Sequence, residues 1–483
     1  MIGAHPRDDL MTAGSTSDER VGGLWWKLVP AAALLCAVAV FNGFPLTYFD
    51  SGGYLKNAYA FAHGVHPPTR PGPFANPFFY RPVAYSLFLT PFATPTTLWV
   101  LPFAQGLLVA YTLHLALRCA GVSLSTRGFL LLVAALTAVT SLPWFSGQVM
   151  PDIFTSVLIL LAFATLWGGD RLTARERVGV AALLTLSLAS HLSHLPLYAG
   201  LLTVGLVWRR LANGEGLLRR DLALRTLGPP ALAVAALVAS NWLVDRKPVL
   251  SESANLFSLA RLVGDGTAQR YLDRACRTRT YLLCAQRDSL KRDSDWFLWD
   301  PQGPWFRYQQ DPAFLDEARD IVRGTLRERW RRQIVASLGN ARRQLQTFGT
   351  EPGWHRSEVE VAPALAAFGE PTLAAYRASR QAQRALPLDS ASNLQIACVY
   401  VALLLLLGCL PVLWKRGDRP VLALIGIGIA GVLINTLVMG ALSSVNARYE
   451  SRVIWLMPFL AWIAVAEVLR TRRRPDVAPT PSV

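Results

Sequence analysis

The chain has 483 residues, of which 52% are hydrophobic and 17% are charged, and its mean hydropathy is +0.31. This composition is too apolar for an ordinary soluble protein of that length, so we expect the bilayer to be its solvent. The formal net charge of +16 could indicate nucleic-acid binding, but the basic residues lie mostly between apolar runs rather than on one face with interleaved aromatic residues. We therefore expect no nucleic-acid partner.

The N-terminal part predicts a tail, one span and a long outer loop. Residues 1–23 have no apolar period and predict a disordered cytoplasmic tail. The first span runs from about 24 to 44, and it is long for a signal peptide, so we expect it to stay uncleaved. The loop at 46–96 is rich in Gly, Pro and aromatic residues. Its apolar stretch at 82–92 is too short to cross hydrocarbon and predicts a juxtamembrane helix.

Apolar runs predict nine further spans, which makes about ten in all. They lie at about 97–118, 128–144, 152–168, 177–190, 195–208, 228–244, 393–413, 420–441 and 453–469. Basic clusters such as Arg209-Arg210 and Lys415-Arg416 flank these runs, and cytoplasmic loops collect such charge.

The expected fold is therefore an all-α polytopic membrane protein with one mostly helical extracytoplasmic insert. Its parts are a transmembrane catalytic region at 24–244, the insert at 245–391, C-terminal spans at 392–470 and a cytoplasmic tail at 471–483. With the N-terminus inside, every unusual polar cluster falls on the outer side.

The insert contains one long amphipathic helix and two cysteines. Asp311 and Pro312 suit a helix start, and one face of the helix that follows is apolar: Phe314, Ala318, Ile321, Val322, Leu326, Trp330, Ile334, Val335 and Leu338. The other face is basic, with Arg319, Arg323, Arg327, Arg331, Arg332, Arg342 and Arg343. Anionic lipid headgroups and plain solvent both fit that face. Cys276 and Cys284 lie in an oxidising compartment on this topology, and the sequence leaves open whether they are bonded.

Two carboxylates follow or begin spans on the outer face. Asp50 stands before Gly52 and Gly53, which permit a tight turn, and a carboxylate at a membrane edge can accept a proton from an alcohol. Asp152 follows Pro151 at the outer start of a span. Helix capping or an Asx-turn explains either residue alone. Two such residues on one face are less easily explained by capping and could share a cavity.

The pattern resembles the glycosyltransferase C superfamily of polyprenyl-phosphate-sugar-dependent enzymes. The likeness rests on the first span, the acidic outer loop, Arg81 with the apolar stretch after it, the second acidic residue, and a late Arg448-Tyr449 before Pro458. It covers the whole topology, although its motifs are short.

The resemblance implies roles for individual residues. Asp50 matches the acidic residue thought to act as general base or to organise the acceptor, and Asp152 matches the second acidic position. Basic and polar groups around the cavity would hold the lipid phosphate, and the candidates are Lys56, Arg81, His191, His194, Arg448, Tyr449 and Arg452. Arg suits phosphate by its planar, forked geometry.

The sequence does not complete a metal site. His191 and His194 would share one helix face, but two His are too few for zinc, and no Cys or carboxylate stands nearby. Phosphate contact and plain packing remain alternatives for this pair. Asp50 is followed by Ser51 rather than by a second acid, which weakens a loop-bound divalent metal without removing it. No phosphate-cradling loop, dinucleotide fingerprint or nucleophile elbow occurs.

The expected function is an inverting glycosyltransferase of the bacterial inner membrane, with its active site facing the periplasm. Its partners would be the lipid bilayer, a polyprenyl-phosphate sugar donor and a glycan, lipid or protein acceptor. Two alternatives stay open: an O-antigen-ligase or polymerase type that uses a lipid-diphosphate donor, and a multispan transporter or flippase.

Overall fold

A computed structural model describes residues 15–67, 76–94, 96–213, 220–350, 352–355 and 358–472. Within these residues all regular structure is helical, apart from one isolated parallel bridge between Leu46 and Gln148. The expectation of an all-helical chain is confirmed for this part.

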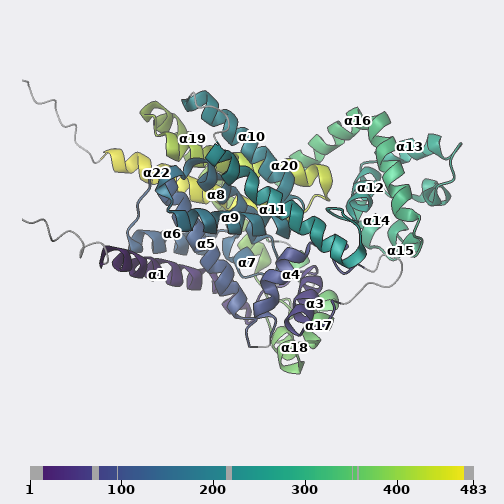
Figure 1. The fold of residues 1–483 in the computed structure, drawn as a ribbon, viewed down its shortest axis with the longest axis horizontal. Helices are drawn as coiled ribbons and strands as arrows, with labels where there is room; N and C mark the ends of the chain where they lie inside the picture. Colours follow the sequence, from purple (N-terminus) through teal and green to yellow (C-terminus); the bar gives the residue numbers. More distant parts are fainter. Residues whose placement is uncertain are drawn as a thin grey trace, which may run out of the picture.

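The first half of the chain supplies most of the helix bundle in Figure 1. Its helices are α1 (Ser15–Leu35), α2 (Ala37–Asn42), α3 (Ser51–Ala62), α4 (Val83–Leu89), η1 (Thr90–Phe92), α5 (Val100–Cys119), α6 (Thr126–Val139), α7 (Leu142–Ser146), α8 (Ile153–Trp167), η2 (Gly169–Arg171), α9 (Ala174–Ser190), α10 (His194–Asn213) and α11 (Arg220–Asp245). The helix α1 begins at Ser15, so residues 15–23 of the predicted disordered tail are helical. Residues 1–14 of that tail lie outside the described part.

The insert and the C-terminal helices complete the chain. The insert contains α12 (Ala254–Gly264), α13 (Thr267–Ala275), η3 (Leu282–Ser289), α14 (Ser294–Trp299), α15 (Pro304–Tyr308), α16 (Phe314–Gln346), η4 (Pro352–His355), α17 (Glu358–Ala366) and α18 (Glu370–Arg377). The last helices are α19 (Leu388–Arg416), α20 (Arg419–Leu442), α21 (Ala447–Ile454) and α22 (Leu456–Arg472). A disulfide joins Cys276 to Cys284 in the insert.

Six helical segments among the described residues are long and apolar enough to cross a membrane: Gly23–Asn42, Val100–Cys119, Arg220–Asp245, Leu388–Arg416, Arg419–Leu442 and Ala447–Arg470. Three shorter apolar segments are Val83–Phe92, Thr126–Val139 and Ile153–Trp167. The helices α6 and α8 rise only about 21–23 Å, against roughly 30 Å of hydrocarbon. The protein is thus a helical, membrane-embedded chain, and the number ten stays a prediction.

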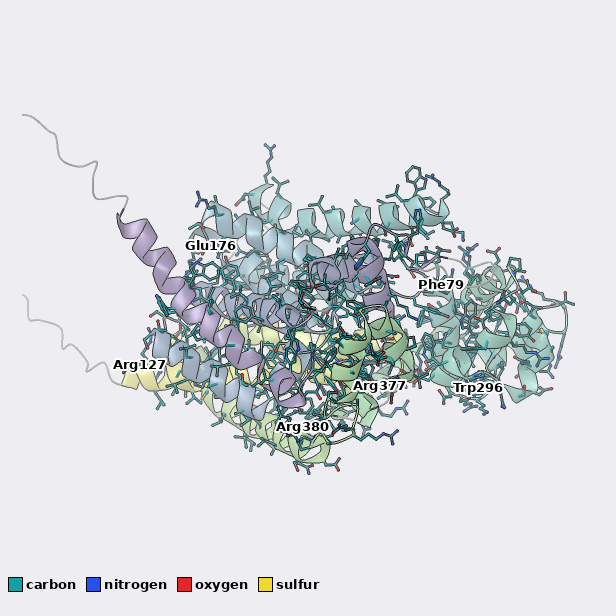
Figure 2. All side chains as sticks on the ribbon, turned by 90° about the horizontal axis from the view of Figure 1, so that it is seen from below. Phe79, Arg127, Glu176, Trp296, Arg377 and Arg380 are labelled. Carbon is teal, nitrogen blue, oxygen red and sulfur yellow. A yellow bond between two sulfur atoms is a disulfide. The ribbon has the colours of Figure 1, made fainter. Side chains whose placement is uncertain are left out.

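The ends of the bundle differ in what they carry. In Figure 1 the start of α1 and the end of α22 lie at one end of the long axis, and α12 to α16 lie at the other. Arg127 and Glu176 lie toward the end with the two termini in Figure 2, whereas Phe79 and Trp296 lie at the insert. This arrangement agrees with the predicted topology, while the cellular side of each end stays a prediction.

The insert consists of two parts with different packing. Its first part has a hydrophobic cluster of its own, in which Trp305 stacks on Phe79 of the loop at 46–96 with ring centroids 5.7 Å apart. Its second part joins the core of the membrane bundle, where Trp354 is 1% exposed and contacts Tyr48 and Trp144 edge to face. The two parts of the insert thus pack in different hydrophobic cores.

The helix α16 joins these two parts. Its backbone is non-helical at Arg329, where φ is −124°. Before this kink, Phe314 and Ile321 are buried; after it, Ile334 and Val335 are exposed. The apolar face expected from the sequence is thus buried before the kink and exposed after it.

A close helix crossing fixes α16 to the bundle, and this crossing predicts a stability effect. A Cβ on Gly440 of α20 would lie 2.5 Å from the backbone nitrogen of Ala341, so Gly440→Ala must push α16 away. We expect a loss of about 1–3 kcal/mol, as for other overpacked sites. Gly408→Ala is the matched control, because nothing lies within 4 Å of its Cβ position. Thermal unfolding in detergent measures both, and equal midpoints for the two variants would contradict the close crossing.

Candidate functional site

The two acidic segments are tied together by their backbones. The amide of Leu46 donates to the carbonyl of Gly147 at 2.9 Å, and the amide of Val149 donates to the carbonyl of Leu46 at 2.8 Å. The hydroxyl of Ser51 also donates to the carbonyl of Val149 at 2.8 Å. Leu46 and Gln148 thus form one isolated bridge. Asp50 lies four residues after Leu46, and Asp152 lies four residues after Gln148.

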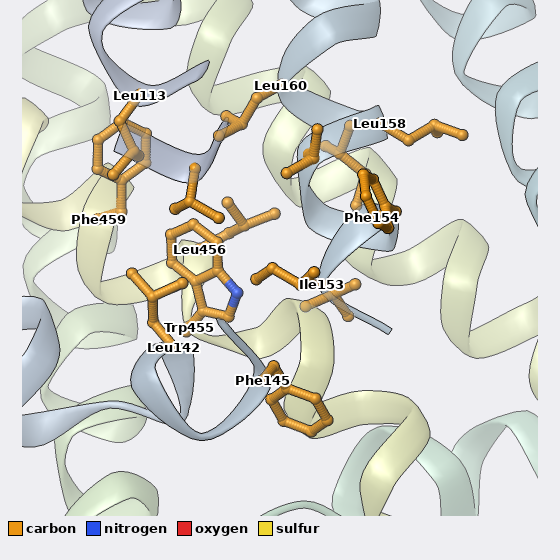
Figure 3. Close-up of a cluster of buried hydrophobic side chains, with 14 of the residues drawn as sticks. Leu113, Leu142, Phe145, Ile153, Phe154, Leu158, Leu160, Trp455, Leu456 and Phe459 are labelled. Carbon is orange, nitrogen blue, oxygen red and sulfur yellow. The ribbon is translucent and has the colours of Figure 1, made fainter. Parts of the chain in front are cut away.

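An apolar core fixes the third segment, 448–452, beside the start of α8. Figure 3 shows Trp455, Leu456 and Phe459 of the C-terminal helices packed among Leu142, Phe145, Ile153 and Phe154. Arg452 lies one helical turn before Trp455, whose indole N–H donates to the Arg452 carbonyl at 3.2 Å. This packing holds Arg452 next to Asp152, the residue that immediately precedes Ile153.

Five charged side chains meet at this point, and we call them the ion cluster: Asp50, Arg81, Asp152, Arg448 and Arg452. Asp50 pairs with Arg81 and with Arg448, whose Nη1 is 3.1 Å from Oδ2. Asp152 pairs with Arg448 at 3.5 Å and with Arg452 at 3.3 Å. Arg448 thus contacts both carboxylates, and three guanidinium groups against two carboxylates leave one positive charge.

Helix capping does not explain either aspartate. Asp50 and Asp152 occupy the N-cap positions of α3 and α8, but neither side chain accepts a capping hydrogen bond. Both are turned instead toward arginines that are distant in sequence.

Exposure varies across the ion cluster. The side chains of Arg452 and Asp152 are 0% and 1% exposed, whereas those of Asp50 and Arg81 are 20% and 24% exposed. Asp50 and Arg81 are therefore the groups that a ligand arriving from outside reaches first.

The electrostatics of Asp50 follow from its partners. Its buried position works to raise the pKa, but the guanidinium groups of Arg81 and Arg448 outweigh that effect and lower the pKa to about 2. The carboxylate is ionised at any physiological pH. With both arginines in place it is also a weak base.

This pKa predicts how stability depends on pH. Relative to the ordinary value of 3.8, a folded-state pKa of about 2 gives stabilisation that is complete above about pH 5 and is lost as the pH falls through the range from 4 to 2. Asp50→Asn removes this titration. We expect the difference in thermal midpoint between wild type and Asp50→Asn to stay constant above about pH 5 and to shrink below about pH 4. Midpoints measured in detergent from pH 3 to 8 test this, and an unchanged difference at pH 3 would contradict it.

Aromatic rings line the guanidinium groups. Arg448 lies over the ring of Tyr48 at 4.5 Å and that of Tyr449 at 5.0 Å, and Arg452 lies 5.3 Å from Tyr449. Arg81 lies 5.8 Å from the ring of Tyr54. These faces stabilise positive charge where water is scarce.

A small, partly open hollow adjoins Arg81. Tyr80 and Pro82 line it on one side, and Leu192, Leu237 and Asn241 line it on the other. It lies between the first outer loop, the turn after α9, and α11.

Gly53 lets Arg81 lie against α3. A Cβ at this position would be 3.1 Å from Nη1 of Arg81, which is tighter than ordinary contact. Gly53 therefore provides room for the guanidinium, and the tight turn expected at Gly52 and Gly53 is instead the first turn of α3.

The remaining predicted phosphate ligands are placed differently. His194 is buried, its Nδ1 is 2.6 Å from the Ser187 carbonyl and its Nε2 is 2.8 Å from Thr155 Oγ1, so neither nitrogen is left for a ligand in this structure. Burial, together with Arg452 and Arg448, lowers the pKa of His191 to about 3, so this residue is neutral. Lys56 is exposed on α3 and forms no ion pair within the described residues.

Two buried polar residues near the ion cluster were missed by sequence reasoning. Gln148 is fully buried, and neither its Oε1 nor its Nε2 has a hydrogen-bond partner among the described residues; the same is true of Asp152 Oδ2. Glu450 is fully buried and accepts hydrogen bonds of 3.0 Å from Thr436. Glu450 precedes the span expected at 453–469 and lies in the polar sequence of α21, so hydropathy gives no signal for its burial.

Neither a metal-ligand cluster within the described residues nor a known relative identifies the site. Within the described residues no group of three or more His, Cys, Asp or Glu side chains could hold a metal ion. No family model, curated protein or solved structure matches the chain.

Proposed function

We propose that the protein is an inverting glycosyltransferase of the glycosyltransferase C type, which transfers a sugar from a polyprenyl phosphate to an acceptor at the outer face of a bacterial inner membrane. The observation that carries this proposal is that Arg448 contacts both Asp50 and Asp152. The acceptor is a glycan, a lipid or a protein of the cell envelope.

The charge of the ion cluster suits a phosphate leaving group. Its net charge is +1, and the guanidinium fork matches phosphate oxygens in a bidentate manner. As the bond from the sugar to the phosphate breaks, negative charge grows on the phosphate and its attraction to these arginines increases. The cluster then stabilises the transition state more than the bound donor.

Asp50 is proposed as the general base. The donor phosphate competes for Arg81 and Arg448, which weakens their hold on Asp50 and raises its basicity above that of the ligand-free site. The acceptor hydroxyl attacks C1 of the sugar and gives its proton to the Asp50 carboxylate. The C1–O bond to phosphate breaks, and the polyprenyl phosphate leaves with the electron pair. One displacement inverts the anomeric centre.

Asp152 is proposed as a positioning residue. It is 1% exposed and pairs with Arg448 and Arg452, so it orients the guanidinium groups and prevents their mutual repulsion.

A donor assay in proteoliposomes tests the proposal. The protein is given polyprenyl-phosphate pentose or hexose donors together with a cell-envelope extract as acceptor, and free polyprenyl phosphate is measured by mass spectrometry. We expect its release to depend on Asp50. Use of only lipid-diphosphate donors supports the ligase alternative, and movement of an intact donor across the bilayer supports the flippase alternative. Either result contradicts the proposal.

A further inference from the structure

The second half of α16 carries an exposed apolar stripe. Trp330, Ile334 and Leu338 recur every fourth residue and are 51%, 49% and 55% exposed, and Val335 beside them is 71% exposed. Side chains at such spacing lie on one face of the helix.

The neighbouring face of this half is held by the protein. Gln333 donates to Asp265 at 2.7 Å, Ala341 abuts Gly440, and Gln344 exchanges hydrogen bonds with the backbone of Asn446. The apolar stripe lies beside these contacts, and its side chains stay exposed to the surroundings of the bundle.

The end of α16 lies at the level of the outer ends of two spans. Gly440 lies close to the end of α20, which is at Leu442. Beyond α16, the ring of Phe348 lies 6.3 Å from that of Tyr400, which is well inside α19, and a Cβ on Gly349 would meet Ser392 of the same helix. The chain at 341–349 is thus at the edge of the predicted hydrocarbon layer.

The exposed residues around the stripe are apolar residues of α20 and arginines of α16. Leu433, Leu437 and Leu442 of α20 are 45%, 47% and 53% exposed, as expected for a lipid-facing span that reaches the crossing with α16. Exposed arginines flank the stripe at Arg327, Arg331 and Arg342. An apolar face bordered by arginines matches acyl chains below a layer of phosphates.

We infer that the second half of α16 is an interfacial anchor, with its apolar stripe in the outer leaflet and its arginines on the phosphates of anionic phospholipids. This inference is independent of the proposed catalytic function. The apolar face and the basic face expected from the sequence then both contact the bilayer, but only in the part of α16 after the kink at Arg329.

Photocrosslinking in proteoliposomes of phosphatidylglycerol and phosphatidylethanolamine tests the anchor. The full chain carries p-benzoylphenylalanine as Val335→p-benzoylphenylalanine or, separately, Leu338→p-benzoylphenylalanine, and peptide adducts are identified by mass spectrometry. The same substitution at Leu404, which is 69% exposed in the middle of α19, is the positive control. Asp320, whose side chain is 56% exposed on α16 before the kink, is the negative control.

We expect phospholipid adducts at 335, 338 and 404 and none at 320, with phosphatidylglycerol enriched at 335 and 338. Absence of lipid adducts at 335 and 338 while 404 is labelled overturns the inference. Crosslinks from 335 or 338 to a second copy of the chain also overturn it, because the stripe would then be a protein interface. Equal lipid labelling at 320 would show that proximity at 335 is unspecific and would likewise overturn it.

Discussion

Asp50→Asn is expected to lower the rate of sugar transfer by about 10²–10⁴-fold, the range that a general base contributes. Asparagine keeps the shape of the side chain and can still accept hydrogen bonds from Arg81 and Arg448, but it cannot take the proton of the acceptor. We expect the effect mainly on kcat, because the arginines proposed to bind the donor phosphate remain. Initial rates of polyprenyl phosphate release, compared at saturating donor, measure it.

Asp320→Asn is the matched control for this prediction, since it removes one carboxylate whose side chain is 56% exposed and distant in sequence from the ion cluster. We expect wild-type rates from it. Asp50→Asn protein that retains its thermal unfolding transition and also full activity would refute the role of Asp50 as base.

Arg452→Met is expected to lower the free energy of unfolding by about 3–5 kcal/mol, the usual cost of removing one partner from a buried ion pair. The Arg452 side chain is 0% exposed, and besides Asp152 it donates to the side-chain oxygen of Asn435 at 3.0 Å. Its loss leaves the Asp152 carboxylate with Arg448 as its remaining ion-pair partner within the described residues. Denaturant unfolding in mixed micelles measures the loss.

A double-mutant cycle separates charge from packing at this pair. Asp152→Asn in the Arg452→Met background removes the poorly paired charge, so we expect the double variant to be more stable than the sum of the two single losses predicts. Arg319→Met, at an arginine whose side chain is 47% exposed, is expected to change stability by less than about 1 kcal/mol. Strict additivity in the cycle would contradict a direct Arg452–Asp152 interaction.

Much of the ion cluster could be predicted because topology places it. The five residues Asp50, Asp152, Arg81, Arg448 and Arg452 stand in predicted outer loops or at predicted span ends, so assigning each loop to a side is enough to gather them on one face. Their pairing needs no detailed packing argument, since opposite charges at the edge of a low-dielectric region attract strongly.

Other features depend on contacts that no local pattern encodes. Gln381 accepts a hydrogen bond from the amide of Thr47 at 3.0 Å across 334 residues and donates to the carbonyl of Trp354 at 2.7 Å. No sequence pattern in the polar stretch at 348–387 indicates that it packs against the loop that follows the first predicted span. The choice between phosphate contact and packing at His194 depends on similar contacts, because its two nitrogens are satisfied by α8 and α9, which only tertiary packing brings near.

Helix lengths also could not be predicted from the sequence. Apolar runs locate α6 and α8 correctly, but hydropathy alone does not reveal that each is too short to span roughly 30 Å when straight. The kink at Arg329 likewise has no Pro or Gly to mark it, and the helical period continues through it.

A cryo-electron microscopy structure of the protein in nanodiscs with polyprenyl phosphate tests the central claim most directly. We predict that the phosphate lies within hydrogen-bond distance of Arg81 and Arg448, beside Asp50, with the prenyl chain leaving toward the membrane. In that complex the contacts of Asp50 with the two arginines are longer or broken. Phosphate bound away from these arginines, with the ion cluster unchanged, would contradict the claim that this cluster is the site of sugar transfer.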